Sequence, residues 1–353
     1  MAHLLQERFA SLVDAKLRDT LVQRNGAVWN NRYEGDPKAG AVKIPVRDIE
    51  VTVAAYSKAN GKTLTEGATS YINVIIDKDY AVNEIIDGYD AAAVPDNLVA
   101  DRLDSAGYSL GVQMNSDGTK VLVAGATPIS NATTLTYQNV YAAFVTARTA
   151  LSNAKVPLAG RFALVTPECY ALILQSTEFI KASALGDAVV QTGALGQIAG
   201  FNIFEDATLP DTSVFIVGHP NWCTRIEEWA VPVRLQSLDG SGKYIGASAV
   251  QGRKIYTHAV TKSSTLLIRP TMIDPKITVT GGTTDKAEIV CTGSKSIKYR
   301  FYDASDTTPE WGNWTDYSTA ISVAEGDKIE AYGLHTEGTK TITVSHTVTA
   351  AEL

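Results

Sequence analysis

Residues 191–205, QTGALGQIAGFNIFE, form the most distinctive local pattern of the chain. Gly193, Gly196 and Gly200 recur within this short stretch, and an apolar run begins at Phe201. Glycine adopts backbone conformations that other residues avoid, so the pattern predicts a series of tight turns. These turns lead into a short strand over 201–205. The spacing does not match a dinucleotide-binding GxGxxG motif, and no convincing strand precedes it.

Helices and strands alternate irregularly on both sides of this stretch. Apolar spacing predicts helices over 95–116 and 136–151, with Thr136 as the cap, and a further helix that begins at Pro167. Short apolar runs predict strands over 121–124, 162–165, 214–217, 231–235, 254–260 and 265–268. No regular βαβ order emerges, so we expect an α+β fold instead of a doubly wound sheet.

The N-terminal segment reads as an amphipathic helix that continues to Leu21 and stops at Asn25–Gly26. Leu5, Phe9 and Leu12 belong to its apolar stripe. Such a stripe must cover something, and the sequence leaves open whether that is the protein's own body or a neighbouring molecule.

A long hairpin is predicted next. Strands over 41–46 and 49–53 are followed by a polar connector, residues 57–67, and by strands over 70–76 and 82–86. The connector contains Lys58, Lys62 and Glu66 and has no aromatic residue. A hairpin of this length with a polar tip favours a projecting arm over an ordinary surface loop.

The composition changes near residues 270–275. From Lys276 onward the chain reads as six or seven short strands, which is typical of a small immunoglobulin-like sandwich. No cysteine pair is available here for an antibody-type disulfide. Trp311 and Trp314 are more often core or edge aromatics in such a domain than a platform for a ligand.

The overall composition bounds the class of protein. The chain has 353 residues, 31 basic against 38 acidic side chains and a net charge of −7. The acidic balance argues against a protein whose main task is gripping nucleic acid, although not against one that encloses it. Three separate cysteines support neither a disulfide framework nor a zinc site, and neither a signal peptide nor a membrane helix is expected. The composition therefore predicts a soluble intracellular protein of more than one domain.

No motif for catalysis or cofactor binding is recognisable. Residues 61–63 and 240–243 resemble fragments of a phosphate loop but lack its other required positions, and the five histidines form no helical metal pair. Cys169 lies near the start of a predicted helix, where a buried apolar role is more common than a reactive thiol. We therefore expect no catalytic residue, no metal and no cofactor.

The glycine-rich stretch resembles the G-x-x-G-x-x-x-G-F-x-V segment of major capsid proteins of tailed bacteriophages, with Ile203 in place of the valine. Three further segments resemble that family in the same order: RYEG at 32–35 with VKIP at 42–45, YAVNEIID at 80–87, and VQGRKIY at 250–256. The resemblance covers roughly residues 1–272. It implies the Hong Kong 97-type fold, an α+β fold with an N-arm, a projecting E-loop, a peripheral domain with a spine helix, and an axial domain.

On this resemblance the chain divides into an N-arm over 1–40, an E-loop over 41–87, a peripheral domain over 88–134, a mainly axial domain over 135–250, peripheral strands over 251–272 and an immunoglobulin-like domain over 275–353. Leu5, Phe9, Leu12, Lys58, Lys62 and Glu66 become candidates for contacts between subunits, and Trp311 and Trp314 for outer-surface contacts.

The function implied is a major capsid protein that assembles with itself, as hexamers and pentamers, into an icosahedral shell around double-stranded DNA. The implied partners are a separate scaffolding protein, a portal and decoration proteins, without a membrane. The protein would be assembled in the host bacterial cytoplasm and would end in the virion capsid. Its tail from Lys276 has seven basic and eleven acidic residues, so most of the acidic surplus would lie on an outer domain.

Three alternatives remain from the sequence. The first is the shell protein of a bacterial encapsulating compartment, which shares the capsid fold. The second is a carbohydrate- or cell-surface-binding protein that acts through Trp311 or Trp314. The third is an enzyme with a site assembled in space, using Cys169 and a histidine.

Overall fold

The computed structural model describes residues 18, 20–46, 50–51, 53, 55–58, 69–93, 98–176, 196–281, 285–335 and 338–353. Contacts divide the chain into two compact units. One contains Met1–Arg18, Asn31–Met114 and Thr224–Thr261, and the other contains Asp19–Asn30, Asn115–Cys223 and Lys262–Leu353. Each unit is therefore built from segments that are far apart in the sequence. Within the described residues, no helix combines the length and apolarity that a bilayer span requires.

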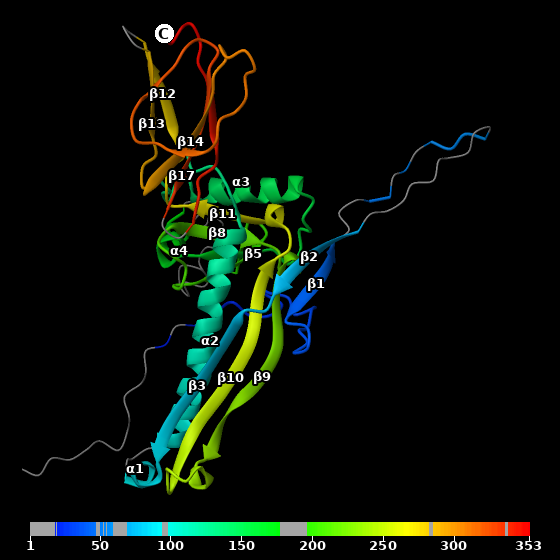
Figure 1. The fold of residues 1–353 in the computed structure, drawn as a ribbon, viewed down its shortest axis with the longest axis vertical. Helices are drawn as coiled ribbons and strands as arrows, with labels where there is room; N and C mark the ends of the chain where they lie inside the picture. The colour runs from blue at the N-terminus through cyan, green and yellow to red at the C-terminus, as the bar shows by residue number, and fades with distance from the viewer. Residues whose placement is uncertain are drawn as a thin grey trace, which may run out of the picture. The chain divides into compact units, whose positions relative to one another are not determined.

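The first unit is built on a long three-stranded antiparallel sheet, visible in Figure 1 as strands that run side by side. Its order is β3 (Lys78–Asp87), β10 (Ala247–Val260) and β9 (Cys223–Ser237). β9 and β10 are much longer than the sequence pattern predicted, because their outer halves alternate polar and apolar residues only weakly. Ile86, Val250 and Ala106 form the core between this sheet and helix α2 (Leu98–Gly125), while the short helix α1 (Gly88–Ala93) follows β3.

A separate two-stranded ribbon, β1 (Ala41–Val46) with β2 (Ser70–Ile75), confirms the predicted hairpin strands. The register runs from Ala41 opposite Ile75 to Val46 opposite Ser70. The predicted return over 82–86 pairs with β10 instead, so it belongs to the long sheet. The predicted strand over 49–53 is absent at its described positions 50, 51 and 53.

Helix α2 continues beyond the predicted stop at 115–118, and the predicted strand over 121–124 is wrong because these residues are helical. The polar residues that suggested a turn are buried instead. Thr119 accepts a hydrogen bond from the Gln23 amide at 2.6 Å, and a side chain on Gly118 would meet the Trp29 ring at 3.0 Å. Tertiary contacts thus stabilise a helical segment that its local propensity disfavours.

The second unit contains a six-stranded mixed sheet in the order β4-β11-β8-β5-β7-β6. The strands are β4 (Thr127–Pro128), β11 (Leu266–Pro270), β8 (Ser213–Gly218), β5 (Phe162–Val165), β7 (Phe201–Glu205) and β6 (Gln197–Ile198). Helices α3 (Val140–Asn153) and α4 (Pro167–Leu174) contribute to one continuous core with this sheet.

Helix α3 buries the predicted face, since Val140, Phe144, Ala147 and Leu151 are all fully buried. Its predicted cap at Thr136 is wrong, because the helix begins at Val140. The Asn139 side-chain oxygen accepts from the Thr136 backbone N–H, which holds the preceding residues in a turn. The helix at Pro167 is confirmed, and Thr166 caps it by accepting from the Cys169 backbone N–H.

The described part of the glycine-rich stretch forms a tight hairpin between β6 and β7, in which Ile198 pairs with Phe201. Ala199 and Gly200 form its turn with φ values of 45° and 84°. The predicted strand Phe201–Glu205 is confirmed at its bounds. The positive φ at both turn positions explains why a glycine follows the alanine here.

The predicted N-terminal helix is wrong at its end, because residues 20–24 belong to no helix. Gln23 is buried there, and its amide donates to Thr119 and Asp206 while its oxygen accepts from Trp29 Nε1. These contacts favour an irregular backbone over a continued helix. Leu5, Phe9 and Leu12 lie outside the described residues.

The tail forms two sheets, with orders β12-β13-β16 and β15-β14-β17-β18. The strands are β12 (Lys276–Thr280), β13 (Lys286–Val290), β14 (Ser296–Tyr302), β15 (Thr315–Asp316), β16 (Ile321–Ser322), β17 (Lys328–Leu334) and β18 (Val344–Thr347). Both sheets contribute to one core that includes Ala287, Ile289, Ile329 and Ala331. The predicted strand over 311–317 is reduced to β15, and Trp311 makes only an isolated bridge with Tyr302.

Candidate functional site

The β1–β2 ribbon exposes one apolar face. Tyr71 and Ile75 point to the same side of β2, with exposures of 65% and 64%, and Asn73 lies between them. Pro45 on β1 is opposite Tyr71 in the ladder. Nearby described positions are also apolar and exposed, namely Val51, Val53 and Tyr56. Large exposed apolar side chains gathered on one segment mark a surface that binds another protein.

The opposite face of the ribbon is firmly held by its own unit. Ile44 and Val74 are buried against Ile226 of β9. The Gly35 backbone N–H donates to the Glu227 carbonyl at 3.2 Å, and a side chain on Gly35 would lie only 2.8 Å from the Glu228 Cα. The ribbon is therefore fixed along one face and free along the other.

The predicted contact residues are only partly placed. Lys58 is exposed, as expected for a residue near the hairpin tip. Lys62 and Glu66 lie outside the described residues, as do Leu5, Phe9 and Leu12. Their role in subunit contacts stays a prediction. The exposed apolar face that includes Tyr71 and Ile75 was missed, although the alternation of Tyr71, Asn73 and Ile75 could have indicated it.

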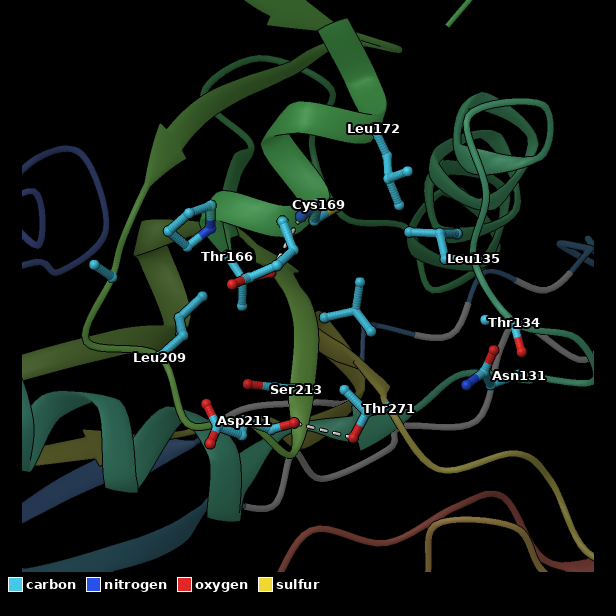
Figure 2. A pocket seen from close by; sticks show the side chains of 14 residues that line it. Asn131, Thr134, Leu135, Thr166, Cys169, Leu172, Leu209, Asp211, Ser213 and Thr271 are labelled. Atoms are coloured by element: carbon cyan, nitrogen blue, oxygen red, sulfur yellow. Dashed lines mark hydrogen bonds between the residues drawn. The ribbon is translucent and has the colours of Figure 1, made fainter. Parts of the chain in front are cut away.

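A cavity of about 460 Å³ lies beside the start of α4 in the second unit. Figure 2 shows Thr166 and Cys169 at the helix start, with Asp211, Ser213 and Thr271 across from them. Thr271 Oγ1 donates to the Asp211 carbonyl at 3.1 Å. Leu135, Leu172 and Leu209 add apolar surface to the lining, so the cavity combines hydroxyls and carboxylates with leucines.

The chemistry of the cavity does not favour catalysis. Burial raises the pKa of the Cys169 thiol to about 12, so the thiol stays protonated at neutral pH. Burial also raises the pKa of Cys223 to about 12. Among the residues that the structure describes, no group of three His, Cys, Asp or Glu side chains could hold a metal ion. Cys169 is thus a small buried apolar residue, which was the interpretation favoured from the sequence.

The outer face of the four-stranded tail sheet carries a row of aromatic and cationic side chains. Arg300 lies between Trp311 and Trp314, with its guanidinium carbon 4.8 and 4.9 Å from the two ring centroids. Tyr302 flanks Trp311, and Tyr332 flanks Trp314, with ring centroids 5.5 and 4.8 Å apart. We call these five residues the aromatic–cation row.

A lysine reaches over each end of the row. Lys328 Nζ lies 5.1 Å from the Tyr302 ring centroid, and Lys340 Nζ lies 5.3 Å from that of Tyr332. Glu330 pairs with Arg300 at 2.6 Å beneath the row. Strand alternation places these side chains outward, because the alternate residues Ile297, Tyr299 and Phe301 face the core.

The two tryptophans are therefore neither core residues nor free ligand platforms. Trp314 is 36% exposed and Trp311 is half-buried, while Arg300 covers a face of each ring. The sequence indicated the aromatic residues but not the arginine between them. Arg300 lies ten or more residues from both tryptophans, and only the pairing of β14 with β15 brings them together.

The link between the six-stranded sheet and the tail is held by a buried asparagine. The Asn131 side-chain amide donates to the carbonyls of Pro270 and Met272, both at 2.8 Å. Its backbone N–H donates to the Asp274 carboxylate at 2.7 Å, and its side-chain oxygen accepts from Arg269 at 2.8 Å. Residues 270–274 are therefore an ordered connection rather than a loose linker.

Solved structures with the same fold are phage capsid subunits. A chain of Mycobacterium phage Che8 is 19% identical with a TM-score of 0.63, and the match covers 76% of this chain and 98% of that chain. The capsid of cyanophage P-SCSP1u matches at 14% identity and a TM-score of 0.62, covering 76% and 93%. The mature capsid of bacteriophage PhiM1 matches at 13% and 0.59, covering 76% and 92%. The described body thus has the Hong Kong 97-like capsid fold, a mixed α+β fold.

A family model described as phage capsid protein matches residues 48–262, which is more than half of the chain. The chain therefore belongs to the phage capsid protein family, a family of structural proteins. Membership and fold together identify its class as a bacteriophage major capsid protein of icosahedral capsids. A comparison with curated proteins finds no match.

Proposed function

We propose that this protein assembles with itself, as hexamers and pentamers, into an icosahedral shell that encloses double-stranded phage DNA. The observation that carries the proposal is the β1–β2 ribbon, which is anchored on one face and exposes Tyr71 and Ile75 on the other. A subunit in a shell needs apolar surface that only a neighbour can cover, and many modest contacts of this kind sum over a closed symmetric assembly.

In this proposal residues 1–40 form the N-arm and residues 41–87 include the E-loop, whose ribbon lies over an adjacent subunit. The peripheral domain combines 88–134 with 251–272, and 135–250 is mainly axial. Lys58, Lys62 and Glu66 contact the neighbour at the hairpin tip, and Leu5, Phe9 and Leu12 pack beneath a neighbour or hold the arm down. The exposed position of Lys58 is compatible with this role.

The tail, residues 275–353, is proposed to be an immunoglobulin-like domain on the outer surface of the shell. Two antiparallel sheets of three and four strands with a shared core support this classification. The strand order also supports it, because β14 pairs with β17 and β13 pairs with β16, as expected when a chain crosses repeatedly between two sheets.

A scaffolding protein and a portal are proposed as assembly partners in the host bacterial cytoplasm, with decoration proteins on the finished virion. The net charge of −7 supports enclosure of DNA without sequence-specific binding, because the chain has no basic surplus to neutralise phosphates.

Electron microscopy of the expressed full-length protein tests this function. We expect closed icosahedral particles, alone or with a co-expressed scaffolding protein from the same phage genome. Deletion of residues 57–67 should leave a folded subunit that no longer forms shells. Normal shells from the deletion would refute the E-loop assignment. Particles that package a cargo enzyme and no DNA would instead identify an encapsulating compartment.

A further inference from the structure

Charge is distributed unevenly over the tail. The tail from Lys276 carries seven basic and eleven acidic residues, a net charge of −4. The outer face of the four-stranded sheet has the opposite sign, with Lys298, Arg300, Lys328 and Lys340 against Asp316 and Glu330. An acidic domain with one cationic face presents a local site for an anionic partner.

The two carboxylates of this face are already engaged. Asp316 pairs with Lys298 at 2.7 Å, and Glu330 pairs with Arg300 at 2.6 Å. Lys328 and Lys340 instead lie over tyrosine rings at the two ends of the aromatic–cation row. Positive charge is thus available at both ends, and partly exposed aromatic side chains lie between.

We propose that the aromatic–cation row binds an anionic polysaccharide, whose sugar rings contact the aromatic edges while its acidic groups pair with Lys328 and Lys340. A sugar ring has apolar C–H surfaces and polar rim groups, so it matches a row in which aromatic rings alternate with cations. An acidic peptide fits less well, because peptide interfaces depend on pockets for apolar anchors. The outward residues of β14 and β17 next to the row are mostly charged or aromatic and offer a single aliphatic side chain, Leu334.

Strand geometry gives the row a fixed layout. Arg300 on β14 is opposite Glu330 on β17, and Tyr302 is opposite Lys328, so side chains from neighbouring strands stand together on one face. A linear polymer lying across β14 and β17 would meet the aromatic and charged groups in order. The site lies on the tail alone, and its placement outside a shell rests on the proposed function.

The experiment uses the full-length protein and three probes: alginate, which is a carboxylated polysaccharide, neutral dextran and single-stranded DNA. We expect binding to alginate, weaker binding to DNA and none to dextran. Lys328→Gln with Lys340→Gln should weaken alginate binding roughly three- to tenfold and reduce its salt dependence. The matched control, Lys276→Gln with Lys286→Gln, removes two exposed lysines from the other sheet and should change binding less than about twofold.

Trp314→Leu separates sugar contact from charge. It should weaken alginate binding without changing the salt dependence, and circular dichroism of the variant checks that the domain stays folded. Equal loss in both lysine pairs, or DNA bound as tightly as alginate, would overturn the proposal. Binding by unassembled subunits but not by intact shells would support the site while contradicting the outer placement of the tail.

Discussion

Asn131 and Asp274 are joined by two reciprocal hydrogen bonds. The Asn131 backbone N–H donates to the Asp274 carboxylate at 2.7 Å, and the Asp274 backbone N–H donates to the Asn131 carbonyl at 3.0 Å. The segment that leads from the six-stranded sheet into the tail is therefore stitched to the residue that follows β4. The asparagine side chain adds two further bonds to carbonyls of the same segment.

Replacing Asn131 with alanine should destabilise the protein by about 2 kcal/mol, because the Pro270 and Met272 carbonyls would lose their donor in a buried site. Chemical denaturation measures this loss, and hydrogen exchange should locate it at residues 270–275. Ser130→Ala is the control. It removes one exposed hydrogen bond to the same carboxylate and should cost about 0.5 kcal/mol or less. Equal effects of the two substitutions would contradict the role given to the amide.

Replacing Tyr71 and Ile75 with threonine should abolish assembly while the subunit stays folded. Both side chains are exposed on the ribbon, and threonine keeps a high strand propensity. We expect the yield of closed shells to fall at least about tenfold, because each contact is repeated over the whole shell. Light scattering during assembly follows the effect. Asn73→Thr, on the same face between the two, should assemble normally; a similar defect in that variant would show that the face itself is unimportant.

Gly200→Ala should lower stability by about 1 kcal/mol, because this residue has a φ of 84° in the turn between β6 and β7. Space is not the cause, since a side chain there would meet only Arg148 at an ordinary distance of 3.8 Å. Gly196→Ala is the matched control: it has open space, and its φ is not positive. Thermal unfolding of both variants checks the difference, and an unchanged Gly200→Ala protein would argue against the strained turn.

Burial raises the pKa of the Cys169 and Cys223 thiols to about 12, so both should resist thiol reagents. The reactive thiolate appears only as the pH approaches the raised pKa, and at pH 8 the native protein should label at neither position. Denaturation should restore labelling at both. Thr292→Cys, at an exposed tail position, provides a positive control that should react at once. Rapid labelling of native Cys169 would contradict its buried placement and revive a chemical role for the cavity.

Arg300→Met should destabilise the tail by about 1–2 kcal/mol, because it removes two cation–π contacts and leaves Glu330 without its partner. Tryptophan fluorescence should change at the same time, since the cation lies over both indoles. Lys298→Met breaks the neighbouring, more exposed pair with Asp316 and should cost less than about 0.5 kcal/mol. Indistinguishable melting curves for the two variants would show that the row adds nothing to stability.

Much of the fold could be predicted from local patterns. The hairpin strands β1 and β2, the strand β7 and the buried face of α3 all follow from the spacing of apolar residues, because each element buries one regular face. The errors occur where distant residues override local preference. Asn115–Gly118 reads as a turn, but Gln23 and Trp29 bury this part of α2 and keep it helical.

The candidate sites were less predictable than the fold. Exposed apolar residues on β2 are visible as an alternation, but the sequence does not say which face of an isolated ribbon is anchored until Ile226 is placed against Ile44. The aromatic–cation row joins residues from three separate segments of the tail. Arg300 meets the tryptophans only through the pairing of β14 with β15, and pairing between strands is not encoded in any single motif.

The ordered connection at Asn131 has a consequence for a shell built from many copies. A domain on a loose tether would sample many orientations, and each copy would meet a polymer independently. A domain held at its root repeats its binding row at intervals set by the symmetry of the lattice. One long polysaccharide can then bridge several rows, and individually weak contacts add up to avid attachment through a high effective concentration.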